Sequence, residues 1–221
     1  MTIGDQAVSA RRDAAPAPGF DPVARLPCYA LLDDCNATVA HPTSRLYTGY
    51  THSLYCVDAA EFPALLAAAD CDRHVIGLFS YELGTAMAET AQRDTGAAVL
   101  AELHFFTQCA RLSADAVDQW LAAQAPDASD VPAGVAGVTH AIDAPSFGAA
   151  IERIHAYIAA GDAYQINYTE RVHFDAYGPP AALYRRLRAR QPVPYGALIA
   201  LPDGRAVLSL SPELFLRNDD G

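Results

Sequence analysis

Short apolar runs, each bounded by Gly, Pro or Asp, recur along this chain and narrow its possible folds more than any other feature. They predict strands at 28–32, 46–50, 53–57, 75–81, 99–112, 196–201 and 205–210. The runs at 46–50 and 53–57 have the aromatic and β-branched content of a pair of neighbouring strands. Pro202-Asp203-Gly204 is a strong turn signal between the last two runs.

Capping residues and apolar spacing predict helices between these runs. Asp58 and Ser113 each precede a helical segment, and Pro179-Pro180 begin another. One face of that last helix carries Arg185, Arg186, Arg188 and Arg190, and we expect it to be solvated. Glu82-Leu83-Gly84 predicts a turn after the strand at 75–81.

The helix that begins at Pro145 and Ser146 has the clearest pattern. Its apolar face consists of Phe147, Ile151, Ile154 and Ile158, and Gly161 is the residue expected to end it. Strands and helices are mixed along the chain without strict βαβ alternation. The sequence therefore predicts an α+β fold.

Composition excludes some classes of function. The chain has 221 residues, a net charge of −11 and 52% hydrophobic residues, which indicates a globular protein and argues against nucleic-acid or anionic-membrane binding. All 15 basic residues are arginine, so no step that needs a lysine amine can occur on this chain. No apolar run is long enough for a membrane span. Five scattered cysteines without C-x-x-C spacing predict free thiols and a cytoplasmic location.

Polar side chains follow the helix that ends at Gly161. Along an extended strand from Tyr164 to Thr169, Gln165 and Asn167 would share one face, where two amides can bind a polar ligand or pair with backbone groups. From the residues alone, a solvated edge strand explains the same pattern. The motif consists of Gly161, Asp162, Tyr164, Gln165, Asn167 and Thr169.

A second polar motif, Ser211-Pro212-Glu213, stands at the end of the last predicted strand. Pro212 ends strand pairing, so Glu213 projects where the chain bends. A carboxylate there can act as a general acid or base if burial tunes its pKa. A surface glutamate in a turn is the alternative.

Together these two motifs resemble the chorismate-utilising enzymes, the family of the anthranilate synthase and aminodeoxychorismate synthase large components. The resemblance extends from about Pro27 to Gly221 and implies the mixed sheets and flanking helices of anthranilate synthase component I. Stretches rich in Ala, Pro and Gly predict a flexible leader at 1–26 and a linker at 125–138. The resemblance implies an N-terminal region at 27–124 and the start of an incomplete chorismate-binding domain at 139–221. It also implies that Glu213 is the catalytic-site residue of this chain. The segment 77–84 matches another family pattern, which we interpret as structural.

The family also has a small-molecule pocket in its N-terminal sheet, which binds tryptophan in feedback-regulated anthranilate synthases. By resemblance, the pocket would consist of Leu32, Asp33, Asp34, Ser44, Arg45, Pro194, Tyr195 and Gly196. Asp34 stands where those synthases have serine, so tryptophan inhibition is not implied here. Alternatively, Asp33 and Asp34 simply terminate a strand.

The resemblance implies that chorismate is bound with Mg²⁺ and that ammonia comes from a glutamine amidotransferase partner. The magnesium ligands would lie outside this chain, so no metal-binding residue is predicted within it. Asn167, where anthranilate synthases usually have valine, favours the aminodeoxychorismate branch, as does Leu-Leu-Asp-Asp followed by Ser-Arg-Leu-Tyr-Thr-Gly.

The residue that separates the two branches would follow Gly221: a nucleophilic lysine in aminodeoxychorismate synthases and alanine in anthranilate synthases. We therefore expect the 221-residue chain alone to be inactive. Anthranilate synthase component I and a truncated, non-catalytic binding module stay open. An isochorismate or salicylate synthase is less consistent with the Leu-Leu-Asp and Ser-Arg segments.

Overall fold

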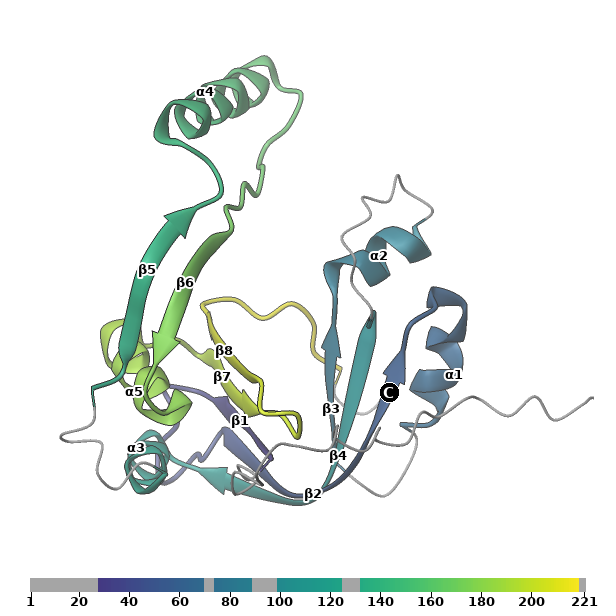
Figure 1. The fold of residues 1–221 in the computed structure, drawn as a ribbon, viewed down its shortest axis with the longest axis vertical. Helices are drawn as coiled ribbons and strands as arrows, with labels where there is room; N and C mark the ends of the chain where they lie inside the picture. The colour runs from purple at the N-terminus through teal and green to yellow at the C-terminus, as the bar shows by residue number, and fades with distance from the viewer. Residues whose placement is uncertain (1–27, 70–73, 89–98, 125–131, 219–221) are drawn as a thin grey trace, which may run out of the picture. The chain divides into compact units, whose positions relative to one another are not determined.

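The computed structural model describes residues 28–69, 74–88, 99–124 and 132–218 (Figure 1). The predicted leader and residues 125–131 of the predicted linker lie outside these ranges. The chain forms two compact units, Met1–Trp120 with Leu187–Gly221, and Leu121–Arg186. Each unit is described by itself.

The first unit is built on a six-stranded sheet. Its strands are β1 (Tyr29–Asp33), β2 (Ser44–Cys56), β3 (His74–Phe79), β4 (Ala101–Leu112), β7 (Tyr195–Ala200) and β8 (Ala206–Ser211). They lie in the order β3-β4-β2-β1-β7-β8, and every neighbouring pair is antiparallel. With the helices described below, this sheet confirms the α+β prediction.

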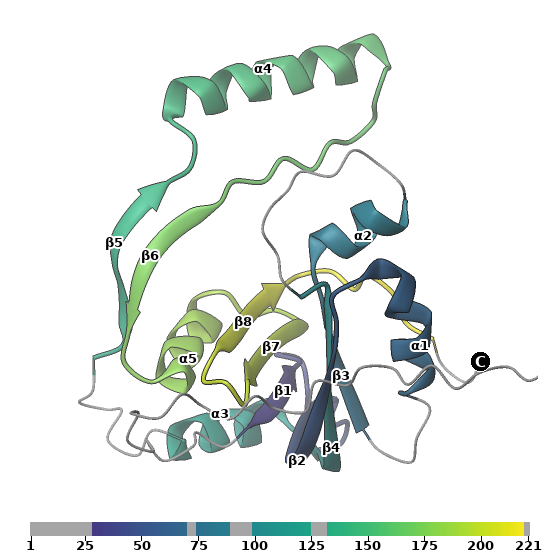
Figure 2. The same ribbon diagram turned by 45° about the vertical axis from the view of Figure 1, so that its right-hand side comes forward.

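One continuous strand, β2, replaces the strand pair predicted at 46–50 and 53–57, so that prediction was wrong. It pairs with β4 from Ser44 opposite Leu112 to Cys56 opposite Ala101, with one register shift after Tyr50. Gly49 has a φ of 70°, which is accessible to glycine at little energetic cost. The register shift after Tyr50 is a β-bulge, which bends a strand without reversing it. The strands β2 and β4 curve together in Figure 1, and Figure 2 shows the same pair turned by 45°.

Apolar side chains cover the sheet of the first unit in two clusters. One contains Ala30, Tyr47, Ile76, Phe106, Ile199 and Leu201, and the other contains Cys56, Leu65, Leu83, Ala101, Leu103 and Phe105. The adjacent residues Phe105 and Phe106 belong to different clusters, as expected where successive side chains of a strand point to opposite faces. Burying one such phenylalanine contributes roughly 1.5–3 kcal/mol.

Two short helices, α1 (Phe62–Ala67) and α2 (Tyr81–Met87), contribute Leu65 and Leu83 to the second cluster. A short 3₁₀ helix (Ala59–Glu61) precedes α1, and the Asp58 carboxylate caps it by accepting from the Ala60 N–H at 2.9 Å. The Ser80 hydroxyl accepts from the Leu83 N–H at 3.3 Å and caps α2. The predicted turn at 82–84 is therefore the first part of a helix, because Ser80 supplies an N-cap.

The helix α3 (Ala114–Ala123) begins where predicted, since the Ser113 hydroxyl accepts from the Ala116 N–H at 3.2 Å. Its Trp120 ring meets the Tyr29 ring edge-on, with centroids 4.9 Å apart. The helix α5 (Pro180–Arg190) begins at the predicted proline pair.

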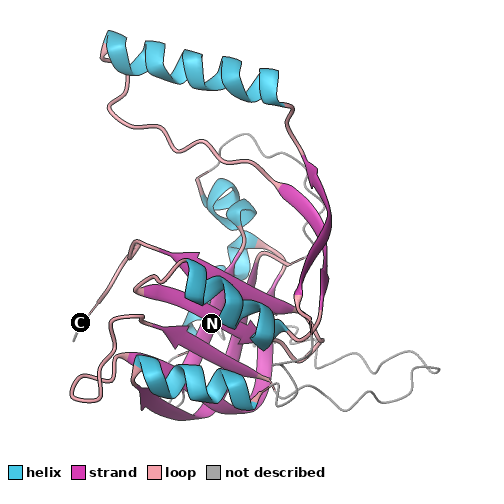
Figure 3. Ribbon diagram, turned by 90° about the vertical axis from the view of Figure 1, so that its left-hand side faces the viewer, coloured by secondary structure: helices cyan, strands magenta, loops and turns pink. Residues whose placement is uncertain are grey.

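The second unit contains the antiparallel pair β5 (Gly134–His140) and β6 (Val172–Tyr177), joined through helix α4 (Ala144–Ala160) (Figure 3). Residues 134–138 of the predicted linker thus belong to a strand. Asp143 caps α4 by accepting from the Ser146 N–H at 2.8 Å. No residue of α4 is buried, so its apolar face contributes little to the stability of the unit as described.

Candidate functional site

Gly161 ends α4 as predicted. It has a φ of 80°, in the left-handed region, and its N–H donates to the carbonyl of Ile158. The Asp162 N–H donates to the carbonyl of Tyr157 at 3.0 Å. This pair of bonds closes the last helical turn and directs the chain into residues 163–171.

Residues 164–169 do not form the predicted strand, because pairing with β5 begins only at Val172, opposite His140. They form an extended connection instead. The predicted grouping of the two amides holds, since Gln165 Nε2 donates to Asn167 Oδ1 at 3.3 Å. Both side chains are exposed, and Tyr164 is 94% exposed. The amides can therefore offer their remaining donors and acceptors to a ligand.

The second motif begins where β8 ends, at Ser211, as predicted. The Ser211 hydroxyl donates to the carbonyl of Glu213 at 2.9 Å and accepts from the Glu213 N–H at 3.4 Å. These contacts close a small turn around Pro212. The Glu213 side chain is exposed, and its acid–base role stays a prediction.

The two motifs belong to different compact units: residues 161–169 to the second and 211–213 to the first. The structure therefore describes each half of the predicted chorismate site separately.

Three segments predicted to form the small-molecule pocket come together in one sheet. On β1, Leu32 pairs with Arg45 of β2, and Asp33 pairs with Gly196 of β7. Tyr195 of β7 pairs with Ser211 of β8, which brings the second motif beside this region.

Side-chain alternation divides the predicted pocket residues between two faces of that sheet. On one face, Asp33 Oδ2 accepts from Arg188 Nε at 2.6 Å, and the Ser44 hydroxyl lies 3.4 Å from Asp33 Oδ1. Asp33 and Ser44 are buried. Leu32 and Arg45, one residue away on each strand, point to the opposite face. Ligand binding by this set stays a prediction.

Asp34 closes the turn after β1. Its carboxylate accepts from the Thr43 hydroxyl at 2.6 Å and from the Asn36 N–H at 2.9 Å, and its N–H donates to Ser44 Oγ at 3.0 Å. The contacts of Asp34 favour the alternative in which the aspartates terminate the strand.

Arg188 corrects the expectation of a solvated arginine face on α5. Its side chain is only 15% exposed, and besides Asp33 it donates from Nη2 to the carbonyl of Ala114 at 3.2 Å. Helical spacing could have predicted the mostly buried position of Arg188, because Arg188 follows the fully buried Tyr184 by one turn.

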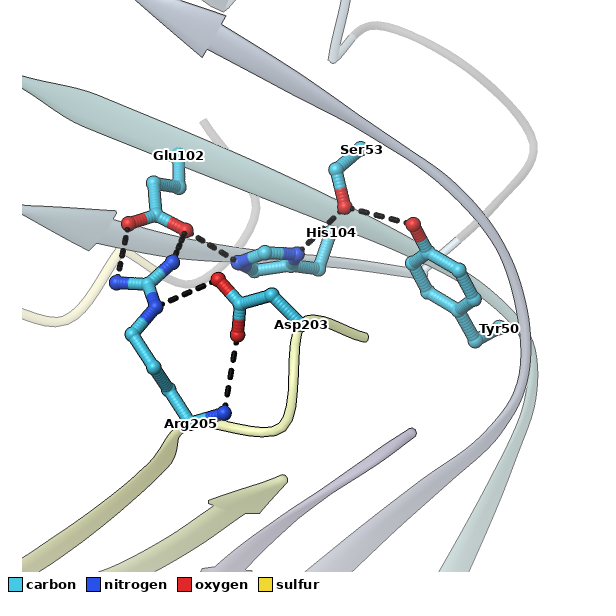
Figure 4. A network of polar contacts seen from close by, with 6 residues as sticks. All are labelled: Tyr50, Ser53, Glu102, His104, Asp203 and Arg205. Atoms are coloured by element: carbon cyan, nitrogen blue, oxygen red, sulfur yellow. Dashed lines mark hydrogen bonds and ion pairs between the residues drawn. The ribbon is translucent and has the colours of Figure 1, made fainter. Parts of the chain in front are cut away.

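A polar network that the sequence analysis missed lies on the first unit (Figure 4). We call it the His104 cluster; its members are Tyr50, Ser53, Glu102, His104, Asp203 and Arg205. Arg205 donates from Nη1 and Nη2 to the two carboxylate oxygens of Glu102, at 3.0 and 2.9 Å. Its Nε donates to Asp203 Oδ2 at 2.6 Å.

On the other side of the cluster, two hydroxyls and the imidazole of His104 form a chain of hydrogen bonds. Ser53 Oγ lies 2.7 Å from His104 Nδ1 and 2.9 Å from the Tyr50 hydroxyl. The only sequence signal was that Glu102 and His104 alternate with apolar residues in the strand predicted at 99–112.

Burial and charge shift the pKa values in this cluster. Burial lowers the pKa of His104, although the nearby Glu102 carboxylate opposes the shift. The hydrogen bond to Glu102 raises the pKa of Arg205. Burial works against ionisation of Asp203, but the hydrogen bonds from Arg205 outweigh it and lower that pKa.

Cys28, Cys35, Cys56 and Cys109 are free thiols, as predicted, and Cys71 lies outside the described residues. The parts of the chain that the structure describes contain no group of three or more His, Cys, Asp or Glu side chains suited to a metal ion. Within the same parts, no helix is both long and apolar enough to cross a membrane.

Comparison with known proteins identifies the family. The sequence pattern of the chorismate binding enzymes matches residues 19–221. The chain belongs to this family.

Similar proteins include members with different named activities. The chain is 38% identical over 94 residues to anthranilate synthase component 1 of Streptomyces coelicolor, covering 42% of this chain and 18% of the relative. It is 36% identical over 96 residues to 2-amino-4-deoxychorismate synthase of Streptomyces globisporus, covering 43% and 19%. With aminodeoxychorismate synthase component 1 of Salmonella typhimurium it shares 28% identity over 162 residues, covering 66% and 35%. The matched parts thus span about a third or less of each relative.

Proposed function

We propose that this chain is the N-terminal part of an aminodeoxychorismate synthase component I. The complete reaction replaces the 4-hydroxyl of chorismate by ammonia, giving 4-amino-4-deoxychorismate and water for para-aminobenzoate and folate synthesis. A cytoplasmic glutamine amidotransferase partner would supply the ammonia. The observation that carries the proposal is the family match over residues 19–221 together with the motif around Asn167, which favours this branch.

In this proposal the chain contributes polar side chains to the chorismate site. The Gln165 and Asn167 amides, already hydrogen-bonded to each other, would bind oxygens of the substrate. Glu213 would act as a general acid or base, since the departing 4-hydroxyl needs a proton. Because Glu213 is exposed, another part of the enzyme would have to cover it in the complete active site.

Magnesium is part of the proposal, but not of this chain. Mg²⁺ suits a substrate with several carboxylate and hydroxyl oxygens because it is a hard cation that shares its shell with water. In this proposal the Mg²⁺ ligands come from another part of the enzyme.

Anthranilate synthase component I is the second candidate, supported by the similarity to the Streptomyces coelicolor protein. The two candidates differ at one residue after Gly221. The chain contains no lysine, so the nucleophile of the aminodeoxychorismate branch would have to lie beyond it.

Sequencing the gene across the codon for Gly221 tests the proposal. The expected result is continued coding for Pro-Ile-Lys-Gly-Thr. Alanine in place of that lysine would replace the proposal with an anthranilate synthase, and a stop codon would leave only a non-catalytic binding module.

Binding of tryptophan in the predicted N-terminal pocket is a separate part of the proposal. Titration calorimetry of the chain with tryptophan tests it, and Arg45→Met is the variant to compare. Arg45 lies opposite Arg111 on the same face as Leu32, where a ligand carboxylate would find positive charge. Equal binding by wild type and variant would exclude this face as the carboxylate site.

A further inference from the structure

His104 is an ionisable side chain with no access to water. Its exposed fraction is 0%, and its Nδ1 is hydrogen-bonded to Ser53. Its Nε2 lies 3.4 Å from Glu102 Oε2 and makes no hydrogen bond. A second proton on this ring would therefore create a buried cation beside a carboxylate that Arg205 already binds.

The turn between β7 and β8 is the segment most easily displaced from the ring. On either side of His104 the sheet is continuous, with Ser53 of β2 and Ile76 of β3 as paired neighbours. The turn lies beside the imidazole and is held to β4 through Arg205 (Figure 4). Within the turn, the Gly204 N–H donates to the Leu201 carbonyl at 3.1 Å.

Charged and titratable groups face His104 from its own strand, from the turn and from β2. On its own strand it faces Glu102, and on the turn it faces Asp203 and Arg205. From β2 it faces Ser53 and the Tyr55 ring, 6.5 Å away.

Two further groups lie behind this first layer. Tyr50 contacts Ser53, and Cys28 is close enough to feel the charge of Asp203, but burial raises its pKa to about 11, so its thiol stays neutral between pH 5 and pH 8. Ile76 of β3 does not titrate. His104 is therefore the one group of this set expected to change charge near neutral pH.

We propose that protonation of His104 releases the turn at residues 201–206 from β4, so that the attachment of the β7–β8 hairpin depends on pH. A proton binds more strongly to a hydrated imidazole than to the buried one. By linkage, acid must then shift the population toward any conformation that exposes the ring. The positive charge of Arg205 favours the same outcome, because it disfavours a second cation on the neighbouring ring, whereas the Glu102 carboxylate opposes it.

The consequence concerns the strand that follows the turn. β8 is the last strand of the sheet and leads directly to Ser211 and Glu213. Release of the turn loosens the first residues of this edge strand. The inference stands whether or not the proposed enzymatic function is correct.

Amide hydrogen exchange of the complete 221-residue chain, followed by NMR from pH 7.5 to pH 5, tests the proposal. The reporters are the N–H groups of Leu201 and Gly204, and the reference is the Ala114 N–H, which donates to Ala37. After correction for intrinsic exchange, the opening constant at the reporters should rise by up to about tenfold per pH unit below pH 6.5. The Ala114 opening constant should not change. A reporter as insensitive to pH as Ala114 would overturn the proposal.

Two variants assign the effect to one side chain. His104→Asn keeps a hydrogen-bonding atom near the position of Nδ1 but cannot titrate, so the reporters should lose their pH dependence. His41→Asn removes an exposed histidine and should keep the wild-type response. A pH response that persists in His104→Asn contradicts the proposal.

A further measurement on the wild type does not depend on the folding of a variant. The corrected exchange of the reporters should rise as the His104 ring, followed by NMR, becomes protonated, and should level off once protonation of the ring is complete. Exchange that still rises with acid after the ring is fully protonated would show that another group controls the turn.

Discussion

Arg205 and Glu102 form a two-point ion pair across 103 residues of sequence, with nitrogen–oxygen distances of 3.0 and 2.9 Å. The pair joins the turn before β8, the last strand of the sheet, to β4, the second. The Glu102 side chain is 10% exposed and that of Arg205 is 55% exposed. Without Arg205, the Glu102 carboxylate would be a mostly buried charge without its partner. Without Glu102, water could still solvate the exposed Arg205 side chain.

Replacing Arg205 by methionine should destabilise the first unit by about 1–3 kcal/mol, because it leaves the Glu102 carboxylate without its bidentate partner. Urea unfolding measures the loss. Arg111→Met is the matched control, since Arg111 is exposed on β4, and it should change the free energy of unfolding by less than 0.5 kcal/mol or so. Equal effects of the two substitutions would show that the ion pair between Arg205 and Glu102 does not stabilise the first unit.

Asp33 and Asp34 are adjacent, but they should respond very differently to substitution. Asp33→Asn removes the charge that pairs with Arg188, whose side chain is mostly buried, and should cost about 3 kcal/mol of unfolding free energy. Asp34→Asn keeps a side chain that can close the same turn, so its cost should stay within about 0.5 kcal/mol.

The two aspartate variants also distinguish structural from ligand-binding roles. If Asp33→Asn were no more destabilising than Asp34→Asn, the ion pair with Arg188 would not hold the sheet to α5. That result would favour the role in ligand binding that the family resemblance implies for Asp33.

Substitution by alanine at two glycines of the second unit should change its stability in opposite directions. Gly161→Ala places a side chain at a φ of +80° and should lower stability by roughly 1–2 kcal/mol. Gly148→Ala lies inside α4, where a Cβ would meet no atom within 4 Å, and should raise stability by about 0.5–1 kcal/mol. Helix content during thermal unfolding, followed by circular dichroism, measures both. A stabilising Gly161→Ala would show that α4 does not end at this residue.

Cys28 should react slowly with alkylating reagents because burial, aided by the charge of Asp203, raises its thiol pKa to about 11. Only the thiolate is nucleophilic. At pH 8 about one Cys28 thiol in a thousand is ionised, so alkylation should be about a hundredfold slower than for a thiol of pKa 9. The rate should rise about tenfold per pH unit up to pH 10. Peptide mass spectrometry after timed iodoacetamide treatment measures it, and a rate that does not change with pH would contradict the assignment.

Local signals in the sequence predicted most of the secondary structure. Gly161, Ser113 and the prolines at 179–180 ended or began helices where expected, because caps act on the nearest few residues. The prediction of two strands at 46–50 and 53–57 was wrong because the outcome depends on a contact far away in the sequence. A bulge after Tyr50 and a turn are compatible with the same local composition, and only the pairing with the partner strand β4 shows which one is formed.

The candidate site was less predictable than the fold. Residues 164–169 have the composition of a strand, but a strand needs a partner, and β5 pairs only from Val172 onward. The pairing of Asp33 with Arg188 joins residues 155 positions apart, and no local pattern encodes such a contact. The same is true of the His104 cluster, which combines β2, β4 and the turn before β8.

We expect the chain to form part of an enzyme that aminates chorismate at C4. The most direct test is to express the complete reading frame that contains it and incubate the product with chorismate, Mg²⁺ and an ammonium salt. The 221-residue chain alone is the control and should form no product. Chromatography of the complete protein's reaction should show 4-amino-4-deoxychorismate, and this product should be lost in Glu213→Gln. Anthranilate or a 2-amino product would contradict the account, as would turnover by the 221-residue chain alone.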